Sequence, residues 1–467
     1  MIFSSTIFLF YFLPLLLLFY FLAPGIKAKN FVLLLFSFIF FLWGGVFFTL
    51  ILLCSIVFNY FVGQGIEKSK SKTLMFIGIS GNLILLIWFK YAGFLVDNLN
   101  SVLNIVHSPS IILDEIILPI GISFYTFHSI SYLIDIYYKR SPAQKNILDM
   151  ALYIVLFSQL VAGPIIRYRV FAPQLLNRKF DVAQFSNGVE RFIIGLAKKV
   201  LIANTLARLA DESFHQNPDS MSMLLSWAGA LCYTFQIYFD FSGYSDMAIG
   251  LSKLFGFEFP ENFNLPYIAT SIKDFWKRWH ISLSSFFRDY VYIELGGNRK
   301  GKLRTLINLS IVFLLTGFWH GANYTFIVWG IIHGSFLLFE KLGFEKILLK
   351  IPSFFQRSYT FIIVLLAWIP FRADSMVYAV NYWKSLFNTT NDMKYHLVSS
   401  FFTTDLLIAL VLAIFLSFNL HKYLPIVNKE KVTAASLIRI CFLFAILFFS
   451  AVYLMSGTYN PFIYYQF

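Results

Sequence analysis

The chain has 467 residues, of which 58% are hydrophobic and 13% are charged. This composition excludes a soluble domain with a polar shell and is typical of an integral membrane protein. The formal net charge of +13 comes from 37 basic and 24 acidic residues, an excess that membrane proteins usually carry in short cytoplasmic loops. Membrane topology therefore explains the charge, and nucleic-acid binding is not expected.

Apolar runs long enough to cross a membrane recur along the whole sequence, because a spanning helix needs about 20 apolar residues. The sequence predicts an all-α polytopic membrane protein with about ten to twelve transmembrane helices, together with re-entrant and interfacial helices. Residues 1–22 lack the basic start and the small-residue cleavage site of a secretory signal. They are expected to form the first span.

The next apolar run, at residues 31–62, is too long for one simple crossing, and Trp43-Gly44-Gly45 interrupts it. A kinked span or two shorter spans are expected there. Residues 74–96 are predicted to form another span. Residues 98–114 are expected to form a loop that could carry a short interfacial helix.

A helix that begins after Pro119 would place Tyr125, His128, Tyr132 and Asp135 along one stripe, since these spacings share a helical face. Polar groups inside a bilayer face protein or a wet cavity, so the stripe is predicted to point inward. For His128, a hydrogen-bond seam between helices is favoured over a catalytic role.

Residues 185–210 are predicted to be helical, and Lys198 and Lys199 near the middle favour a tilted or interfacial helix. A span is then expected at residues 224–239.

The segment after this span contains Asp240 and Asp246 among small and aromatic residues. Acidic groups inside a membrane are costly, so both are expected to bond to partners within the protein, at a helix break that lines a cavity. Residues 257–267, which include Asn262, are rich in proline and asparagine. They are predicted to form a re-entrant or buried loop that shapes a pocket.

Basic residues outnumber acidic ones between Lys273 and Arg304, so this segment is expected to face the cytoplasm. Topology alone explains the charge about as well as contact with a phosphate-bearing donor, such as a nucleotide-containing thioester. Arg278 and Arg288 are the candidates for such a contact.

Two apolar spans are expected at residues 306–317 and 318–338, and they contain His320 and His333. At about 100° per residue, the two histidines lie roughly 140° apart around a helix. A single straight helix therefore cannot direct both toward one site. From these residues alone, either histidine is a candidate for function.

Several motifs together resemble the membrane-bound O-acyltransferases, in the branch of the alginate and peptidoglycan O-acetyltransferase membrane subunits. The motifs are Arg-Trp-His-Ile-Ser-Leu-Ser at 278–284, Phe-Arg-Asp-Tyr-Val-Tyr at 287–292, Leu-Gly-Gly-Asn-Arg at 295–299 and Gly-Phe-Trp-His-Gly-Ala-Asn at 317–323. The segments 119–128 and 238–246 resemble the same proteins. The resemblance covers most of the chain, and the combination is specific although each tripeptide is weak.

The resemblance implies a ring of tilted helices around a central funnel, in one domain over residues 1–467 with a motif core at 238–334 and an aromatic tail at 457–467. It implies that His320 is the catalytic base and that His280 is a second catalytic residue, which leaves His333 as a structural histidine. His280, or the indole N–H of Trp319 or Trp279, could stabilise the oxyanion or hold the thioester. The predicted substrate contacts are Trp279, Trp319, Asp240, Asn262, Arg278 and Arg288.

The chain ends with Phe-Ile-Tyr-Tyr-Gln-Phe at 462–467, which resembles the aromatic C-terminal motif of acyl-relay partners in the D-alanylation branch of this superfamily. One hypothesis is that Tyr464 accepts the acetyl group first and presents it outside the membrane. An aromatic belt that anchors the tail at the interface explains the same residues equally well.

The predicted function is transfer of acetyl from cytoplasmic acetyl-CoA across a bacterial cytoplasmic membrane to a cell-envelope polysaccharide, with a periplasmic acetyltransferase or esterase as partner. Peptidoglycan is the first choice of acceptor and alginate or another exopolysaccharide the second, whereas D-alanyl transfer to teichoic acid fits less well. No metal or tightly bound cofactor is expected, and membrane lipid surrounds the chain. A transporter or flippase of polysaccharide intermediates is the alternative, although the two halves show no obvious repeat.

Overall fold

The computed structural model describes all residues except 162, 390–401, 419–431, 458–459, 462 and 464–467. The described residues form helices and connecting loops without a strand, which confirms the predicted all-α class. They divide into two compact units, Met1–Gly188 with Leu251–Pro260 and Val189–Gly250 with Glu261–Phe467. The single catalytic domain implied by the resemblance, with its ring around a funnel, stays a prediction.

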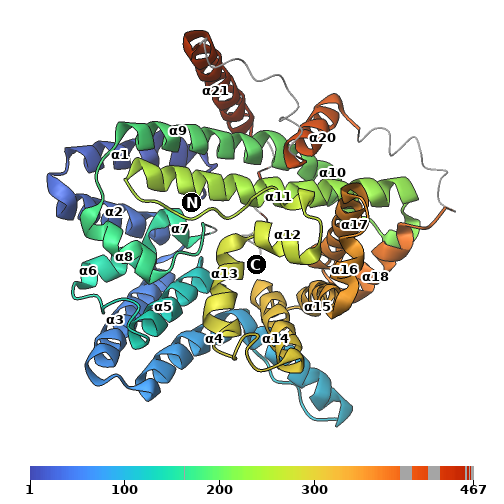
Figure 1. The fold of residues 1–467 in the computed structure, drawn as a ribbon, viewed down its shortest axis with the longest axis horizontal. Helices are drawn as coiled ribbons and strands as arrows, with labels where there is room; N and C mark the ends of the chain where they lie inside the picture. The colour runs from blue at the N-terminus through green and yellow to red at the C-terminus, as the bar shows by residue number, and fades with distance from the viewer. Residues whose placement is uncertain (162, 390–401, 419–431, 458–459, 462, 464–467) are drawn as a thin grey trace. The chain divides into compact units, whose positions relative to one another are not determined.

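The first unit contains a series of helices from the N-terminal part of the chain (Figure 1). They are η1 (Phe8–Phe12), α1 (Leu13–Leu22), α2 (Gly25–Leu42), α3 (Val46–Ser69), α4 (Lys72–Ile105), α5 (Ile122–Tyr137), α6 (Ile147–Val155), α7 (Phe157–Leu160) and α8 (Tyr168–Asn177). The apolar run at 31–62 forms parts of two helices, α2 and α3, which agrees with the expectation of two shorter spans. Gly45, at φ 121°, lies in the break between them.

The loop expected at residues 98–114 is wrong over its first part, because α4 continues without a break to Ile105. Leu95, Leu99 and Val102 are spaced at helical intervals, and this periodicity outweighs the intervening asparagines and serine that favoured a loop. The long helix α4 is therefore one element.

Helix α5 is buried on all sides from Ile122 to Ile136, so its polar stripe is no more buried than the rest of the helix. A hydrogen-bond seam does join α5 to α6, where Ser131 Oγ lies 3.0 Å from Tyr153 Oη. The His128 ring lies 5.5 Å from the Tyr153 ring, measured between centroids. The side-chain bond at this seam is therefore made by Ser131, and His128 takes part through its backbone carbonyl, which accepts from Tyr153 Oη at 3.2 Å.

The second unit holds every predicted catalytic residue that the structure describes. Its helices are η2 (Lys198–Ala203), α10 (Asn204–His215), η3 (Pro218–Ser220), η4 (Pro266–Ile268), α12 (Ile272–Arg278), α13 (Ile281–Phe287), η5 (Arg288–Tyr292), α14 (Lys302–His320), α15 (Tyr324–Phe339), η6 (Glu340–Phe344), α16 (Glu345–Leu348), α17 (Ser353–Arg372), α18 (Met376–Ser385), α20 (Thr404–Ser417) and α21 (Val432–Met455). Helices α9 (Val182–Ala197) and α11 (Met223–Leu254) contribute residues to both units.

The helix break expected at Asp240 and Asp246 is wrong, because α11 runs through both residues as one continuous helix. Both carboxylates have basic partners on the neighbouring helix, Lys199 for Asp240 and Lys198 for Asp246. A carboxylate with an adjacent counterion can stay inside a continuous helix, so these two residues need no helix break.

Helices α14 and α15 form a closely packed hairpin (Figure 1). A Cβ atom added to Gly330 would lie 2.5 Å from the carbonyl oxygen of Phe313 and 3.2 Å from Cα of Gly317. Small residues at such crossings let two membrane helices approach backbone to backbone. The turn at Gly321 ends α14, and the Asn323 side chain caps α15 by accepting the Thr325 N–H.

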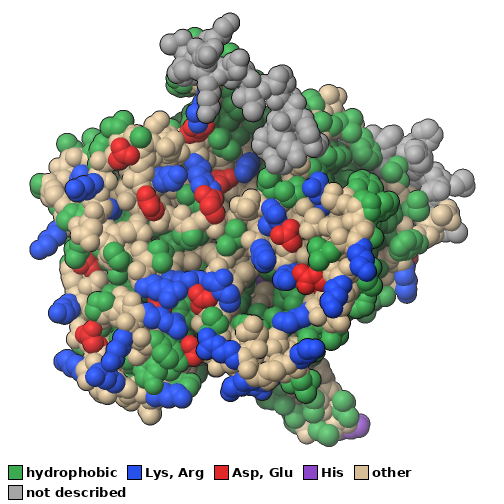
Figure 2. Space-filling view, viewed as in Figure 1, with side chains coloured by type: hydrophobic (Ala, Val, Ile, Leu, Met, Phe, Trp, Pro, Cys, Tyr) green, Lys and Arg blue, Asp and Glu red, His purple; other side chains and the backbone are tan. Residues whose placement is uncertain are grey.

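Seven helices of the described chain are long and apolar enough to cross a membrane, in agreement with the predicted polytopic architecture. They are Gly25–Leu42, Val46–Ser69, Lys72–Ile105, Lys302–His320, Tyr324–Leu348, Ser353–Arg372 and Leu437–Met455, with Phe8–Leu22 and Thr404–Ser417 as shorter apolar helices. Hydrophobic side chains are exposed on the face in view in Figure 2, and Lys and Arg side chains lie among them.

Substitution of Gly330 by alanine is expected to destabilise the α14–α15 hairpin by about 1–3 kcal/mol, because the added methyl group meets a backbone carbonyl that cannot move aside. Thermal unfolding of the detergent-solubilised protein would measure the change. Gly93→Ala is the matched control, since Gly93 lies in α4 with open space at its Cβ position. An equal melting temperature for wild type and Gly330→Ala would contradict the close crossing.

Candidate active site

His280 lies in the turn between α12 and α13, and its side chain is fully buried. Its backbone is in the left-handed region, at φ 45° and ψ 54°, which costs a non-glycine residue about 1–2 kcal/mol. The loop before α12 holds this turn. The Asn264 N–H donates to the Arg278 carbonyl at 2.9 Å, and the Ile281 N–H donates to the Asn262 carbonyl at 2.9 Å.

The side chain of Asn262 fixes the tautomer of His280. One Asn262 atom, Oδ1, lies 3.2 Å from the Ser282 backbone N–H, 2.8 Å from Ser282 Oγ and 3.1 Å from His280 Nδ1. A backbone N–H can only donate, so this Asn262 atom is the amide oxygen and His280 Nδ1 must carry the proton. The lone pair of the neutral ring is therefore on Nε2.

Burial lowers the pKa of His280 to about 3, so its imidazole is neutral at physiological pH. A neutral ring with the proton on Nδ1 can accept a hydrogen bond or a proton at Nε2. It cannot donate one there. A lone pair on Nε2 does not fit the oxyanion stabilisation predicted for His280, and it can instead accept a hydrogen bond from a hydroxyl group.

Trp319 brings the two predicted catalytic histidines to one place. Its ring centroid lies 6.2 Å from that of His280 and 4.9 Å from that of His320. His320 is the last residue of α14 and is 3% exposed. The C-terminal end of a helix favours positive charge by about 0.3–1 kcal/mol, which suits a group that takes up a proton.

His320 and His333 do not lie on one straight helix, so the expected boundary between the two spans, at residues 317 and 318, is wrong. His320 ends α14, His333 lies within α15, and both rings contact the same indole of Trp329 at centroid distances of 5.0 Å. The hairpin turn between the helices removes the angular offset that a continuous helix would impose.

A hydrogen bond distinguishes His333 from the other two histidines. The Trp276 indole N–H donates to His333 Nδ1 at 3.3 Å, and an indole nitrogen can only donate. The basic lone pair of neutral His333 is therefore already used, and the proton of the ring lies on Nε2. This bond supports the structural role that the resemblance implied for His333.

The remaining predicted contacts lie in different surroundings. Trp279 is 1% exposed and packs against aromatic rings that include Phe263 and Trp368. Arg278 pairs with Asp274 at 3.0 Å and Arg288 with Asp289 at 2.6 Å. The structure thus brings His280, Asn262, Trp319 and His320 together, and it gives both arginines a neighbouring carboxylate. Their contact with a substrate stays a prediction, and Tyr464 lies outside the described residues.

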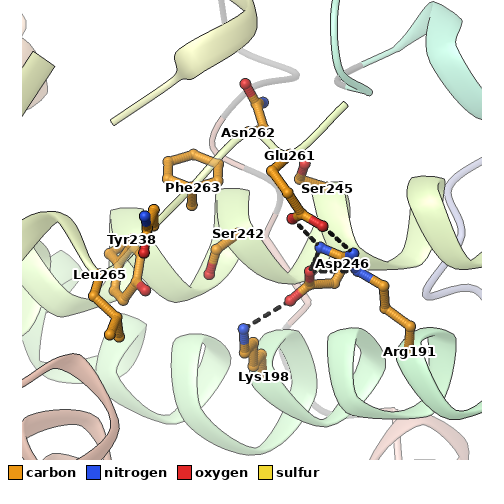
Figure 3. Close-up of a pocket in the computed structure, with 11 residues that line it drawn as sticks. Arg191, Lys198, Tyr238, Ser242, Ser245, Asp246, Glu261, Asn262, Phe263 and Leu265 are labelled. Atoms are coloured by element: carbon orange, nitrogen blue, oxygen red, sulfur yellow. Dashed lines mark hydrogen bonds and ion pairs between the residues drawn. The ribbon is translucent and has the colours of Figure 1, made fainter. Parts of the chain in front are cut away.

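A polar pocket of about 230 Å³ lies beside this cluster in the second unit (Figure 3). Asn262 lines it, so one wall of the pocket is the residue that holds His280. The other lining residues are Arg191, Lys198, Tyr238, Ser242, Ser245, Asp246, Glu261, Phe263, Asn264 and Leu265. This agrees with the expectation that residues 257–267 shape a pocket.

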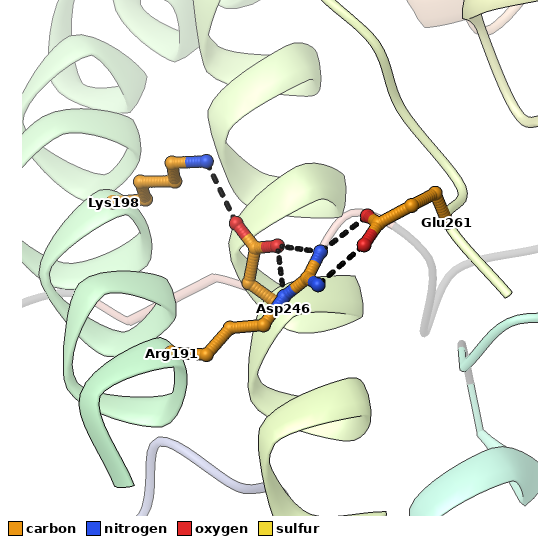
Figure 4. A network of polar contacts seen from close by, with 4 residues as sticks. All are labelled: Arg191, Lys198, Asp246 and Glu261. Atoms are coloured by element: carbon orange, nitrogen blue, oxygen red, sulfur yellow. Dashed lines mark hydrogen bonds and ion pairs between the residues drawn. The ribbon is translucent and has the colours of Figure 1, made fainter. Parts of the chain in front are cut away.

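Arg191, Lys198, Asp246 and Glu261 form a charge network at this pocket (Figure 4). Lys198 Nζ lies 2.7 Å from one Asp246 oxygen, and Arg191 Nη2 lies 2.8 Å from the other. Arg191 also binds the Glu261 carboxylate, with Nη1 2.5 Å from Oε1. The internal partner expected for Asp246 is confirmed. Arg191 was not predicted as a site residue, although Lys198 and Lys199 near the middle of an apolar segment indicated that α9 and η2 face a charged neighbour.

Comparison with known proteins adds independent evidence. A model of the membrane-bound O-acyltransferase family, MBOAT, matches residues 137–375. A probable alginate O-acetylase of Pseudomonas putida is 40% identical over 499 residues and matches 100% of both chains. That of Pseudomonas syringae pv. tomato is 45% identical, over 83% of this chain and 75% of the relative. A peptidoglycan O-acetyltransferase of Helicobacter pylori is 37% identical, over 83% of this chain and 80% of the relative.

Replacement of Asn262 by leucine is expected to destabilise the protein by about 1–3 kcal/mol, because buried N–H groups of His280 and Ser282 lose their acceptor. Thermal unfolding would measure this, and ¹⁵N NMR of labelled histidine would report the tautomer of His280. Asn262→Asp keeps an acceptor, so it should retain the Nδ1–H tautomer and raise the pKa of His280 through the added negative charge.

Asn264→Leu is the matched control, because Asn264 is exposed in the same loop and its hydrogen bonds to Arg278 use backbone atoms of Asn264. An unchanged tautomer signal in Asn262→Leu would show that Asn262 does not set the protonated nitrogen of His280.

Proposed function

Because the chain belongs to the membrane-bound O-acyltransferase family, we propose that it transfers acetyl from a cytoplasmic thioester, acetyl-CoA, to a cell-envelope polysaccharide. The chain is a multi-pass membrane enzyme, and O-acyl transfer to an envelope polymer is the activity that its relatives' names support. Because this family consists of acyltransferases, an enzyme is favoured over the alternative of a transporter or flippase. The observation that carries the catalytic proposal is the pair of buried histidines, His280 and His320, whose rings both pack against Trp319.

In the proposed reaction His320 is the general base. Its imidazole takes the proton of the acceptor hydroxyl while the oxygen attacks the thioester carbonyl carbon, which forms a C–O bond and places negative charge on the carbonyl oxygen. Collapse of this intermediate breaks the C–S bond, and the imidazolium returns the proton to the leaving thiolate. The reaction changes no oxidation state, so atoms and charges balance without an oxidant or a metal ion.

The neutral His280 has a different part in this proposal. Its Nε2 lone pair can accept a hydrogen bond from a second hydroxyl of the acceptor and so orient the nucleophile, whose own proton goes to His320, while Asn262 prevents the ring from turning over. The indole N–H of Trp319 is the donor proposed for the oxyanion, since Nε2 of His280 cannot donate in this tautomer. Burial of all three side chains limits access of water, which would otherwise hydrolyse the thioester.

The acceptor is proposed from the relatives. Peptidoglycan was the first choice from the sequence, but the alginate O-acetylases match at 40–45% identity and the peptidoglycan O-acetyltransferase at 37%. This order favours an exopolysaccharide hydroxyl over peptidoglycan. A periplasmic acetyltransferase or esterase that completes the transfer, and location in the bacterial cytoplasmic membrane, belong to the same proposal.

His320→Ala is expected to lower polysaccharide acetylation by about 10²–10⁴-fold, the usual effect of losing a general base. The measurement is ester-linked acetate released by mild alkali from exopolysaccharide and from peptidoglycan, each purified separately and scaled to the amount of enzyme in the membrane. Loss from only one polymer identifies the acceptor. The control is His333→Asn, which keeps a group that can accept the Trp276 N–H and should retain most of the activity. Wild-type acetate in His320→Ala would refute the role of His320.

Tyr464 is proposed as an acyl relay, which would accept acetyl at its phenol oxygen and pass it to an extracytoplasmic enzyme. Tyr464→Phe removes only this oxygen, so polymer acetate should fall to background while the membrane level of the protein is unchanged. Tyr465→Phe tests the neighbouring phenol. Full acetylation in Tyr464→Phe would exclude the relay and leave direct transfer to the polymer.

A further inference from the structure

We propose that Lys199, Asp240 and Asn204 form a clamp that binds the chain's own segment Asn460, Pro461 and Ile463, and that acetyl transfer depends on this segment being held. Asp240 was predicted to contact substrate, and the clamp gives this residue a positioning role. The dependence of acetylation on the clamp rests on the proposed function, whereas the binding of the segment does not.

The centre of the clamp is a buried ion pair. Lys199 Nζ lies 2.5 Å from Asp240 Oδ1, and both side chains are 2% exposed. Removing two charges from water costs several kcal/mol per ion, and the attraction between them offsets this only when further hydrogen bonds satisfy both groups. A pair buried to this degree is therefore expected to have additional polar partners.

The C-terminal segment supplies those partners. The Ile463 backbone N–H donates to Asp240 Oδ2 at 3.0 Å, and Lys199 Nζ donates to the Pro461 carbonyl oxygen. Asn204 adds a third bond, from its Nδ2 to Asn460 Oδ1 at 3.0 Å. The anion thus binds a backbone donor and the cation binds a backbone acceptor, an arrangement that recognises the segment through its main chain. Ile463 is 6% exposed, so its side chain is buried as well.

The local helix geometry places the two cationic and amide groups for this task. Lys199 and Asn204 are five residues apart, and the Asn204 N–H donates to the Lys199 carbonyl in the π-helical turn η2. In an α-helix, side chains five residues apart point to different faces. The wider π turn brings the side chains of such residues closer to the same face of the helix. Single π-helical turns are frequent at functional sites. Helix α21, which precedes the segment, also packs against η2.

The clamp residue Asp240 is adjacent in the sequence to Phe241, which contacts the histidine cluster. Phe241 follows Asp240 in α11, and its ring contacts the His280 ring edge to face at a centroid distance of 4.7 Å. The helix that holds the C-terminal segment therefore also packs on one of the proposed catalytic side chains. Ile463 is the residue before Tyr464 in the sequence, so the clamp fixes the attachment point of the proposed relay.

The test measures protection of residue 463 by alkylation. Ile463→Cys is introduced in a protein whose natural cysteines are replaced (Cys54→Ser, Cys232→Ala, Cys441→Ser), and its reaction with a membrane-permeant maleimide is timed. The clamp is removed by Lys199→Met with Asp240→Leu, because removing only one partner would leave an unpaired buried charge. The labelling rate is expected to rise by at least about tenfold as the segment opens.

Two further variants sharpen the result. Lys199→Gln with Asp240→Asn keeps a donor and an acceptor without charge, so it should label more slowly than the apolar pair. Arg208→Met with Asp405→Leu removes an exposed ion pair of the same unit and should label at the starting rate. Size-exclusion chromatography of every variant confirms that each one folds.

Acetate on the polymer is measured in the same double variants, with the natural residue at position 463. Faster labelling with loss of acetate supports the proposal. Unchanged labelling in Lys199→Met with Asp240→Leu overturns the clamp, and faster labelling with wild-type acetate overturns its role in transfer. The proposed function fails separately, if His320→Ala keeps its acetate while the clamp variant still exposes residue 463.

Discussion

The crossing of α9 and η2 with α11 is the constraint on which the second unit depends. Gly195 and Gly243 meet at this crossing, where a Cβ on Gly243 would lie 2.7 Å from the Gly195 carbonyl oxygen. The missing side chains allow the backbones to touch, and this closeness lets Lys198 and Lys199 reach the two aspartates of α11. Each charge is stabilised by an adjacent counterion. The continuous course of α11, the wall of the pocket and the binding of the C-terminal segment all follow from these two ion pairs.

The histidine cluster shows how hydrogen-bond partners assign different chemistry to identical side chains. Nδ1 of His280 donates a hydrogen bond to Asn262. Nδ1 of His333 instead accepts a hydrogen bond from Trp276. The lone pair of the first ring is on Nε2, whereas the lone pair of the second is on Nδ1 and accepts the Trp276 N–H. Proximity alone does not separate these rings, since His320 and His333 share the indole of Trp329.

Acyl transfer inside a membrane requires a site that excludes water and still holds polar groups. The aromatic side chains around the histidines meet the first need, because indole and phenyl rings fill space without adding charge. The second need is met by short loops that are fixed at both ends, such as the pairing of Asn262 and Asn264 with the turn at His280. The proposed chemistry depends on these backbone bonds as much as on the imidazoles, since they keep a left-handed residue in one conformation.

The sequence by itself determined the all-α membrane class, the family and the motifs that contain His280 and His320, because composition and short motifs are local properties. It also indicated that Asp240 and Asp246 need internal partners, but it placed a break in α11 that does not exist and ended α4 too early. Whether a helix continues depends on neighbours that cover its polar groups, and these are distant in the chain. Only the tertiary structure decided that α14 and α15 bring His320 and His333 to one indole, that Asn262 accepts a hydrogen bond from Nδ1–H of His280, and that Lys199 and Asp240 hold Ile463. Each of these contacts joins residues that are far apart in the sequence or separated by a turn, so no periodicity along the chain could encode it.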